Sequence, residues 1–404
     1  MATNLNQTPS ANRIHIGIFG KRNAGKSSLI NAITGQNHAI VSDVLGTTTD
    51  PVLKSMELLP LGPVVIIDTP GLDDEGELGA LRVQKAYQIL NKTDIAVLVI
   101  DASFGLTKED SDILKRIHEK EIPCVIVANK SDICLNCNLE DLQLPDSDSA
   151  ILVSSKTGEQ IHELKELIAR QVPQDTIPKS IVADLLNPLD FVVLVVPIDS
   201  AAPKGRLILP QQQTIRDILE AKASAIVVQE TELESTLQSL GKKPKMVITD
   251  SQVFKKVAAV TPDDILLTSF SILFARYKGN LKTLVNGASA LDSLKNGDRI
   301  LISEGCTHHR QCDDIGTVKL PNWIHSYTKK EIEFEFTSGT EFPLDLSSYK
   351  MIVHCGGCML NEREMKYRLK CAEDAKIPIT NYGTCIAYIN GILERSLEPV
   401  KDFL

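Results

Sequence analysis

Long hydrophobic runs are absent from this sequence of 404 residues. No stretch approaches the ~18 consecutive apolar residues that a helix needs to span a bilayer. The sequence therefore predicts that this is not a membrane protein. The first residues, MATNLNQTPSANR, lack the apolar segment of a signal peptide and are too weakly basic for a transit peptide. We therefore expect a cytoplasmic protein that does not bind membranes.

The sequence also lacks an excess of positive charge. Its formal net charge is -9, whereas a broad phosphate-binding surface needs clustered Lys and Arg on a basic background. We therefore expect no nucleic-acid partner. A hydrophobic content of 43% with 24% charged residues is typical of a globular protein, and the length favours two or three domains, of which we expect three.

The nine cysteines do not form the pattern of a disulfide framework. Their number is odd, and the chain begins without a recognisable leader. They are expected to be thiols or metal ligands.

Apolar, strand-like runs alternate with helical patterns along the first 170 residues or so. The runs span 14–19, 64–67, 95–100, 125–128 and 151–153. This alternation predicts an α/β fold with a doubly wound parallel sheet. Prolines at 173, 178 and 188 then break the pattern, so the first domain is predicted to span 1–172.

Two further α/β domains are predicted downstream. Residues 180–275 contain the runs FVVLVVPI, AIVVQ, KMVIT and DILLT, separated by helical patterns. This middle domain carries no recognisable chemistry, and we expect it to mediate homodimerisation. Residues 280–404 contain the runs RILIS, KMIV and IPIT.

A phosphate-binding loop follows the first strand. The segment GKRNAGKSS satisfies G-x-x-x-x-G-K-[ST] between a strand and a helix, which is the context that the motif requires. Lys26 would reach the β- and γ-phosphates, and the Ser27 hydroxyl would bind Mg²⁺. The phosphate-binding residues predicted here are Gly20, Asn23, Ala24, Gly25, Lys26, Ser27 and Ser28.

The motifs that turn such a loop into a GTPase follow in order. In DTPG, Asp68 would hold Mg²⁺ through water and the Gly71 N–H would sense the γ-phosphate; Thr48, in GTTTD, would be a second Mg²⁺ ligand. Together with Lys26, these residues are the predicted catalytic set.

Guanine specificity is predicted from NKSD and SSK. The Asp132 carboxylate would accept hydrogen bonds from guanine N1–H and the 2-amino group, which adenine does not offer in that pattern. The remaining base-binding residues predicted here are Asn129, Lys130, Ser154, Ser155 and Lys156. The chain is thus expected to bind GTP with Mg²⁺ as a P-loop GTPase of the translation-factor-like class.

The segments GKRNAGKSS, GTTTD, DTPG and NKSD resemble the GTPases that include Era and the tRNA-modification GTPase MnmE. Leu72 stands where Ras-like proteins carry a water-orienting glutamine, so slow hydrolysis is expected. In the similar GTPases a P-loop Asn helps to hold K⁺. The resemblance implies this role for Asn23 and predicts stimulation by potassium.

Two cysteine and histidine motifs lie in the last third of the chain: CTH at 306–308 and HCGGC at 354–358. Each follows an apolar run, and parallel strands would bring both motifs to one sheet edge. Spacing alone allows a structural zinc site or a 4Fe-4S cluster, with zinc slightly favoured.

The pattern C-x-H followed by H-C-x-x-C, behind a GTPase and an α/β domain, resembles the FeFe-hydrogenase maturation GTPases, the HydF family. The match extends over essentially the whole chain. It implies Cys306, Cys355 and Cys358 as ligands of a 4Fe-4S cluster whose fourth iron has an exchangeable ligand. His308, His309 and His354 are the candidates for that position.

The resemblance implies a scaffold or carrier that delivers the di-iron subcluster to apo-FeFe-hydrogenase, with the maturases HydE and HydG as partners. Two alternatives remain open. One is a ribosome- or tRNA-acting GTPase with a C-terminal zinc module, and the other is a GTPase switch that controls a metal-dependent enzyme domain. The acidic charge counts against the first, and the absence of a convincing nucleophile or general acid weakens the second.

Overall fold

The computed structural model describes residues 12–35, 52–69, 71, 88–134, 138–142, 144–145, 148–172, 180–198, 207–279, 281–305, 314–339, 341–343 and 345–404. Contacts along the chain divide it into two compact units, Met1–Thr176 and Ile177–Leu404. Within the described ranges, no helix is both long and apolar enough to cross a bilayer.

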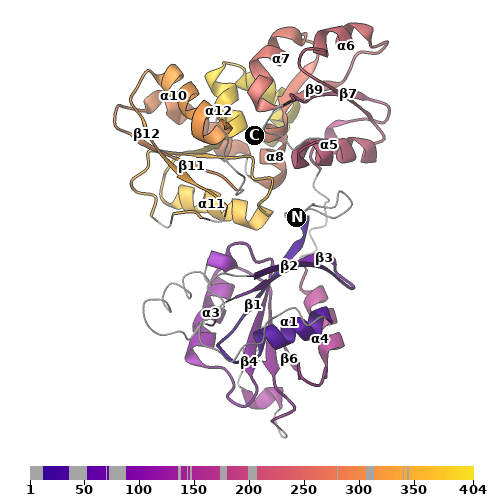
Figure 1. The fold of residues 1–404 in the computed structure, drawn as a ribbon, viewed down its shortest axis with the longest axis vertical. Coiled ribbons are helices and arrows are strands. Elements are labelled where there is room, and N and C mark those ends of the chain that lie inside the picture. The colour runs from indigo at the N-terminus through magenta and orange to yellow at the C-terminus, as the bar shows by residue number, and fades with distance from the viewer. Residues whose placement is uncertain are drawn as a thin grey trace. The chain divides into compact units, whose positions relative to one another are not determined.

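The first unit is built around a six-stranded sheet of order β2-β3-β1-β4-β5-β6 (Figure 1). Its strands are β1 (Ile14–Phe19), β2 (Val52–Leu58), β3 (Gly62–Asp68), β4 (Ile95–Asp101), β5 (Cys124–Asn129) and β6 (Ser149–Leu152). The predicted parallel sheet is confirmed, with one addition: β2 pairs antiparallel to β3 at the edge. Strand β2 was not predicted, because its VLKSMEL segment is largely exposed and has no apolar run.

Helices cover both faces of this sheet. In the part of this unit that the structure describes, the α-helices are α1 (Lys26–Thr34), α3 (Lys108–Glu119) and α4 (Ile161–Arg170). Side chains of α1 and α4 pack into one core and those of α3 into another, on opposite faces (Figure 1). The central strands are buried on both faces, which explains their continuous apolar sequences.

The second unit contains two parallel four-stranded sheets, of order β10-β9-β7-β8 and β12-β11-β13-β14. The strands of the first are β7 (Phe191–Val195), β8 (Ser224–Val228), β9 (Met246–Thr249) and β10 (Leu266–Ser269). Those of the second are β11 (Arg299–Ser303), β12 (Glu333–Thr337), β13 (Met351–His354) and β14 (Ile379–Asn381). Each sheet falls within one of the two α/β regions predicted from the sequence, so the fold class is confirmed.

Helices follow most of these strands. The first sheet is accompanied by α5 (Leu209–Glu220), α6 (Leu233–Ser239), α7 (Phe254–Val260) and α8 (Phe270–Lys278). The second is accompanied by α9 (Leu281–Ala288), a π-helix at Ile315–Lys319, α10 (Leu320–Thr328), α11 (Glu362–Asp374) and α12 (Tyr382–Ile389). The last helix, α13 (Leu393–Leu397), packs against β10 of the first sheet.

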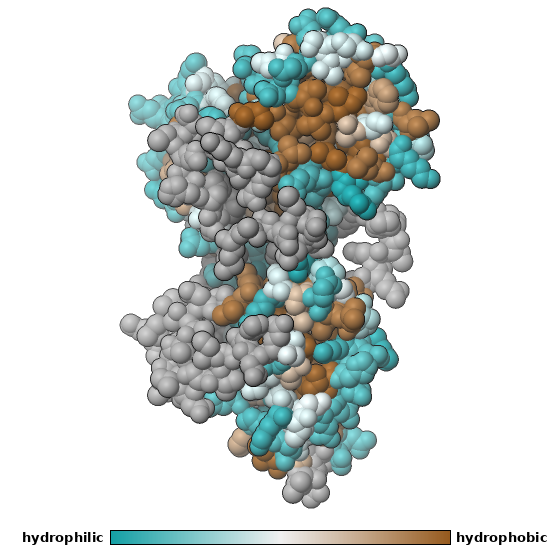
Figure 2. Space-filling view, turned by 45° about the vertical axis from the view of Figure 1, so that its right-hand side comes forward, coloured by the Kyte–Doolittle hydropathy of each residue, from teal (hydrophilic) through white to brown (hydrophobic). Residues whose placement is uncertain are grey.

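Strand β8 forms an edge of the first of these sheets and is incompletely covered. Val227 on β8 is 44% exposed, and Leu219 on the neighbouring α5 is 57% exposed. Figure 2 shows a broad hydrophobic area on the upper part of the molecule, on the side that carries this sheet. An edge strand with apolar neighbours is a surface that another chain can pair with.

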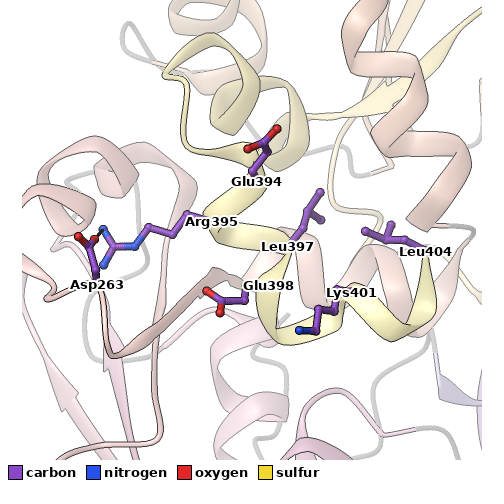
Figure 3. Close-up of a pocket in the computed structure, with 7 residues that line it drawn as sticks. All are labelled: Asp263, Glu394, Arg395, Leu397, Glu398, Lys401 and Leu404. Atoms are coloured by element: carbon purple, nitrogen blue, oxygen red, sulfur yellow. Dashed lines mark ion pairs between the residues drawn. The ribbon is translucent and has the colours of Figure 1, made fainter.

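The two sheets of the second unit share one hydrophobic core, which includes Val193 from β7 and Ile352 from β13. The C-terminal segment also joins them. Arg395 of α13 donates to the carbonyl oxygens of Ala258 at 2.9 Å and Thr261 at 2.6 Å, and pairs with Asp263 at 3.4 Å (Figure 3). The residues that line the cleft around this arginine include no cysteine or histidine, and its contacts hold α13 against the end of α7 and the segment that follows it, so we assign Arg395 a structural role.

Candidate nucleotide and metal sites

The loop between β1 and α1 has the backbone of a phosphate cradle. Gly20, Asn23 and Gly25 have φ angles of 141°, 61° and 94°. A Cβ on Gly20 would lie 2.2 Å from the Val99 carbonyl oxygen, so only glycine fits there. The loop leads into the N-terminus of α1, where backbone N–H groups and the helix dipole favour an anion.

The side chains that would contact phosphate and Mg²⁺ lie together at the ends of β1 and β3. The Lys26 ammonium donates to the carbonyl oxygens of Gly20 and Lys21, each at 2.7 Å, which holds it at the loop. The Ser27 hydroxyl donates to Asp68 Oδ2 at 3.3 Å. Burial raises the pKa of Asp68, and the Lys26 charge opposes that shift. A serine oxygen beside a half-buried carboxylate is the expected start of a Mg²⁺ site.

The NKSD and SSK motifs contact each other, and NKSD also contacts the phosphate loop. Asn129, which is fully buried, donates from Nδ2 to the Ala24 carbonyl oxygen at 3.0 Å and accepts from the Ser155 N–H at 3.0 Å. One side chain therefore ties the phosphate loop to the SSK loop. Asp132 Oδ1 accepts from the Ser154 hydroxyl at 2.8 Å, and Lys156 Nζ lies 3.8 Å from Oδ2.

Asp101 lies in this site, although the motifs did not predict it. Its Oδ2 accepts from Lys130 Nζ at 2.7 Å, so the carboxylate fixes the side chain predicted to pack over the base. Asp101 ends β4 and pairs in register with Asn129 on β5. In the sequence, this role could have been predicted from the position of Asp101 at the end of the strand-like run that precedes the NKSD strand.

The remaining predicted residues of the nucleotide site lie as follows. Ser28 is half-buried on α1, and Gly71 is half-buried after β3. Thr48 and Leu72 lie outside the described residues.

The two cysteine motifs follow neighbouring parallel strands, as predicted: β11 pairs with β13, and Ser303 lies opposite His354. Cys355 Sγ accepts from the backbone N–H groups of Gly305, at 3.0 Å, and Gly357, at 3.4 Å. Since Gly305 directly precedes Cys306, the backbone leading to the first motif contacts the sulfur of the second. N–H donors aimed at a sulfur favour a thiolate or a metal-bound sulfur.

The described part of this site is incomplete as a metal centre. Cys306, His308 and His309 lie outside the described residues, and among the described ones no three His, Cys, Asp or Glu side chains gather to hold a metal. Burial raises the pKa of Cys355 to about 11 and also raises that of Cys358. Both thiols are therefore protonated without a metal, and a metal would have to displace the protons.

His354 has both ring nitrogens occupied. Nδ1 lies 2.7 Å from the Cys355 carbonyl oxygen and must donate to it, so Nε2 accepts from Arg368 Nη1 at 3.0 Å. Burial and the nearby Arg368 charge lower the pKa of His354 to about 3, so the ring is neutral. In this arrangement His354 fixes the backbone at Cys355 and offers no nitrogen to an iron. This geometry speaks against it as the exchangeable ligand.

Arg368 holds this histidine in place from α11. The helix is capped at its N-terminus by Asn361, whose side chain accepts from the Glu364 N–H at 3.0 Å. Arg368 is fully buried and pairs with Glu364 at 3.0 Å, and it also donates to the Ser303 hydroxyl at 3.0 Å. The sequence carries no motif that predicts this contact.

Comparison with known families decides the identity of the second unit. The hydrogen maturase F dimerization domain matches residues 181–279, and the hydrogen maturase F tetramerization domain matches residues 282–399. The chain belongs to the hydrogen maturase F (HydF) family. A 50S ribosome-binding GTPase family matches residues 15–130, so this HydF-family chain begins with a P-loop GTPase domain.

Curated relatives match the GTPase part. The tRNA modification GTPase MnmE of Nitrosomonas eutropha is 34% identical over 183 residues, which cover 43% of this chain and 40% of that protein. GTPase Der of Clostridium perfringens is 33% identical over 189 residues, covering 43% of this chain and 42% of that protein. The HydF-family chain thus spans about two fifths of the length of these relatives.

Solved structures show a more distant likeness. Aquifex aeolicus Era bound to GDP.AlF4- is 20% identical, with a TM-score of 0.36, and the match covers 56% of this chain and 98% of that one. The G domain of the T. maritima FeoB iron transporter is 24% identical with a TM-score of 0.31, covering 40% and 99%.

The buried position of Arg368 predicts a large effect on stability. Arg368→Met leaves Glu364 charged and unpaired in the core, so we expect a loss of about 3–5 kcal/mol in the free energy of unfolding. The measurement is urea unfolding of the metal-free protein, followed by the fluorescence of Trp323, the single tryptophan, which lies in the second unit.

The matched control is Lys366→Met on the same helix. Lys366 forms the same kind of ion pair with Glu362, at 2.7 Å, but 65% of its side chain is exposed. Its loss should cost about 0.5 kcal/mol or less. Equal losses in the two variants would contradict the role assigned to the buried pair.

Proposed function

We propose that this chain hydrolyses GTP and carries a 4Fe-4S cluster as a scaffold in the maturation of FeFe-hydrogenase, delivering the di-iron subcluster to the apoprotein. The observation that carries the proposal is the convergence of Gly305 and Cys355 at one sheet edge, in a chain that matches both HydF domains. HydE and HydG are the proposed upstream partners. The proposed domain limits are 1–172, 180–275 and 280–404.

In the proposed GTPase reaction, backbone N–H groups of the loop from Gly20 to Gly25 would surround the phosphates. Lys26 would neutralise charge on the β- and γ-phosphates, and Ser27 and Thr48 would bind Mg²⁺. Asp68 already lies beside Ser27 and would hold the ion through water. Hydrolysis would be slow because Leu72 cannot orient the attacking water.

Base recognition would come from the residues that Asn129 and Ser154 hold in place. Ser154 fixes one oxygen of Asp132, which leaves the carboxylate oriented for two donors of guanine. The side chain of Lys130, anchored on Asp101, would lie over the base.

The two described cysteines of this site, Cys355 and Cys358, are suited to bind a 4Fe-4S cluster. The two N–H donors to Cys355 are suited to an electron-rich sulfur, and Gly357, with a φ of 62°, permits the tight turn between Cys355 and Cys358. Cys306 would be the third ligand. When bound, such a cluster offers one iron for an exchangeable ligand, for which His308 and His309 are the histidine candidates that remain.

Self-association is proposed to use β8. A second copy of the chain would cover the exposed Val227 and Leu219 and extend the sheet from its edge. The dimerization domain matched at 181–279 contains this edge, which favours another copy of the chain over an unrelated partner.

The base assignment predicts a change of specificity. Asp132→Asn replaces an acceptor with an amide that donates, so GTP affinity should fall about 10- to 100-fold while xanthosine triphosphate is better accepted. Competition binding with both nucleotides measures this. An unchanged preference for GTP would remove Asp132 from the site.

Potassium is expected to stimulate hydrolysis through Asn23. The rate in potassium should exceed that in sodium by at least about ten-fold at equal ionic strength, because a bound cation would stabilise the developing charge. Asn23→Gly keeps the positive φ of this position and should erase the difference, whereas Asn23→Asp retains an oxygen ligand and should keep it. Equal rates of the native protein in both salts would refute the potassium role.

The metal assignment predicts the iron content. Cys306→Ser, Cys355→Ser and Cys358→Ser should each lose most of the iron from anaerobically purified protein, because two thiolates seldom retain a four-iron cluster. Cys371→Ser, in α11, is the control and should keep its iron. The GTPase rate should change little in all four. Colourless native protein that contains zinc would instead support the alternative of a zinc module.

The proposed interface predicts a change of oligomeric state. Val227→Glu places a charge on the β8 edge, so sedimentation should show dissociation at concentrations where the native chain self-associates. Phe104→Glu changes a residue of the first unit that is 79% exposed and should leave the association unchanged. Unaltered association in Val227→Glu would place the interface elsewhere.

A further inference from the structure

Lys278 is a buried cation beside the proposed cluster loop. It is the last residue of α8 and is only 4% exposed. Its Nζ donates to three backbone carbonyl oxygens that follow Cys355: Leu360 at 3.0 Å, Cys358 at 3.2 Å and Gly357 at 3.4 Å. The three N–H bonds of the ammonium are therefore all directed at the turn that contains Cys358.

The ammonium of Lys278 has no carboxylate at ion-pair distance among the described residues, although the charge of Glu362 acts on it from further away. Among the described residues no Asp or Glu forms an ion pair with its Nζ, whereas the equally buried Arg368 pairs with Glu364. A buried ammonium without an anion is costly, so an anionic group is expected nearby. Burial lowers the pKa of Lys278 to about 8, and the charges of Cys358, Cys355 and Glu362 oppose that shift. Besides Glu362, which pairs with Lys366, the anions available to Lys278 are the two thiolates that a metal centre would require.

We propose that Lys278 is a positioning residue of the cluster: it anchors the turn of Cys358 and supplies the positive charge that stabilises the reduced cluster. The inference rests on the proposed cluster. Reduction adds one negative charge, and a cation held in a buried site is poorly screened, so its removal should make the reduction harder.

The anchor also joins two parts of the second unit. Lys278 lies at the end of the stretch matched by the dimerization domain, while its three acceptors lie in the stretch matched by the tetramerization domain. Helix α8 follows directly after β10, in the sheet whose other edge is β8. The cysteine turn is thus held by a helix that continues from the sheet proposed for self-association.

The test uses the full-length protein, purified anaerobically, with iron analysis and a redox titration followed by electron paramagnetic resonance at pH 7. Lys278→Gln keeps N–H donors but loses the charge, so it should retain most of the iron and show a more negative midpoint potential. Lys278→Met loses donors and charge, so it should also release iron faster to a chelator. Lys278→Arg keeps the charge and should restore the potential towards the native value.

Lys282→Met is the matched control, because it removes an exposed lysine four positions further along the chain. It should match the native protein in iron content and potential. If Lys278→Gln and Lys278→Met both keep the native potential and the native rate of iron release, the inference is wrong. If the native protein itself binds no iron, the proposed function fails instead. If both neutral variants lose all their iron, Lys278→Arg decides: a midpoint potential near the native value supports the proposal, and a clearly more negative potential despite the retained charge contradicts it.

Discussion

Parallel strands present their carboxyl ends at one edge of a sheet, and both candidate sites of this chain depend on that constraint. In the first unit, β1 leads into the phosphate loop, β3 ends at Asp68 and β5 ends at Asn129. In the second unit, β11 and β13 lie side by side, so segments about 50 residues apart in the sequence meet at Gly305 and Cys355, which are joined by a hydrogen bond. The same arrangement therefore positions a nucleotide site and a cysteine site in two different sheets.

Buried polar groups then fix the loops that leave these edges. Asn129 ties two loops of the nucleotide site together through backbone contacts at 3.0 Å. In the second unit, Arg368 orients His354, and His354 in turn holds the Cys355 carbonyl. Such fully satisfied networks restrict the loops to one arrangement, which is the preorganisation that a binding site needs.

The fold and the site were predictable from the sequence to different degrees. Buried central strands such as β4 and β5 were found because their apolar runs are continuous, whereas β2 and β12 were missed because they are edge strands with exposed or alternating residues. The GTPase motifs are local in sequence and were readable directly. Arg368 and Lys278 were missed because their contacts join segments far apart in the chain, where no spacing rule applies. His354 was named from the sequence as a candidate ligand, but the hydrogen bonds that occupy both of its ring nitrogens were visible only in the structure.

The central claim is that the GTPase and the cysteine site serve the maturation of FeFe-hydrogenase. The most direct measurement is hydrogen evolution by apo-FeFe-hydrogenase after mixing with this chain, purified anaerobically from cells that also contain HydE and HydG. We expect activity with the native chain and none with the Cys355→Ser variant. Equal activation by the native and Cys355→Ser chains, or none by either, would contradict it.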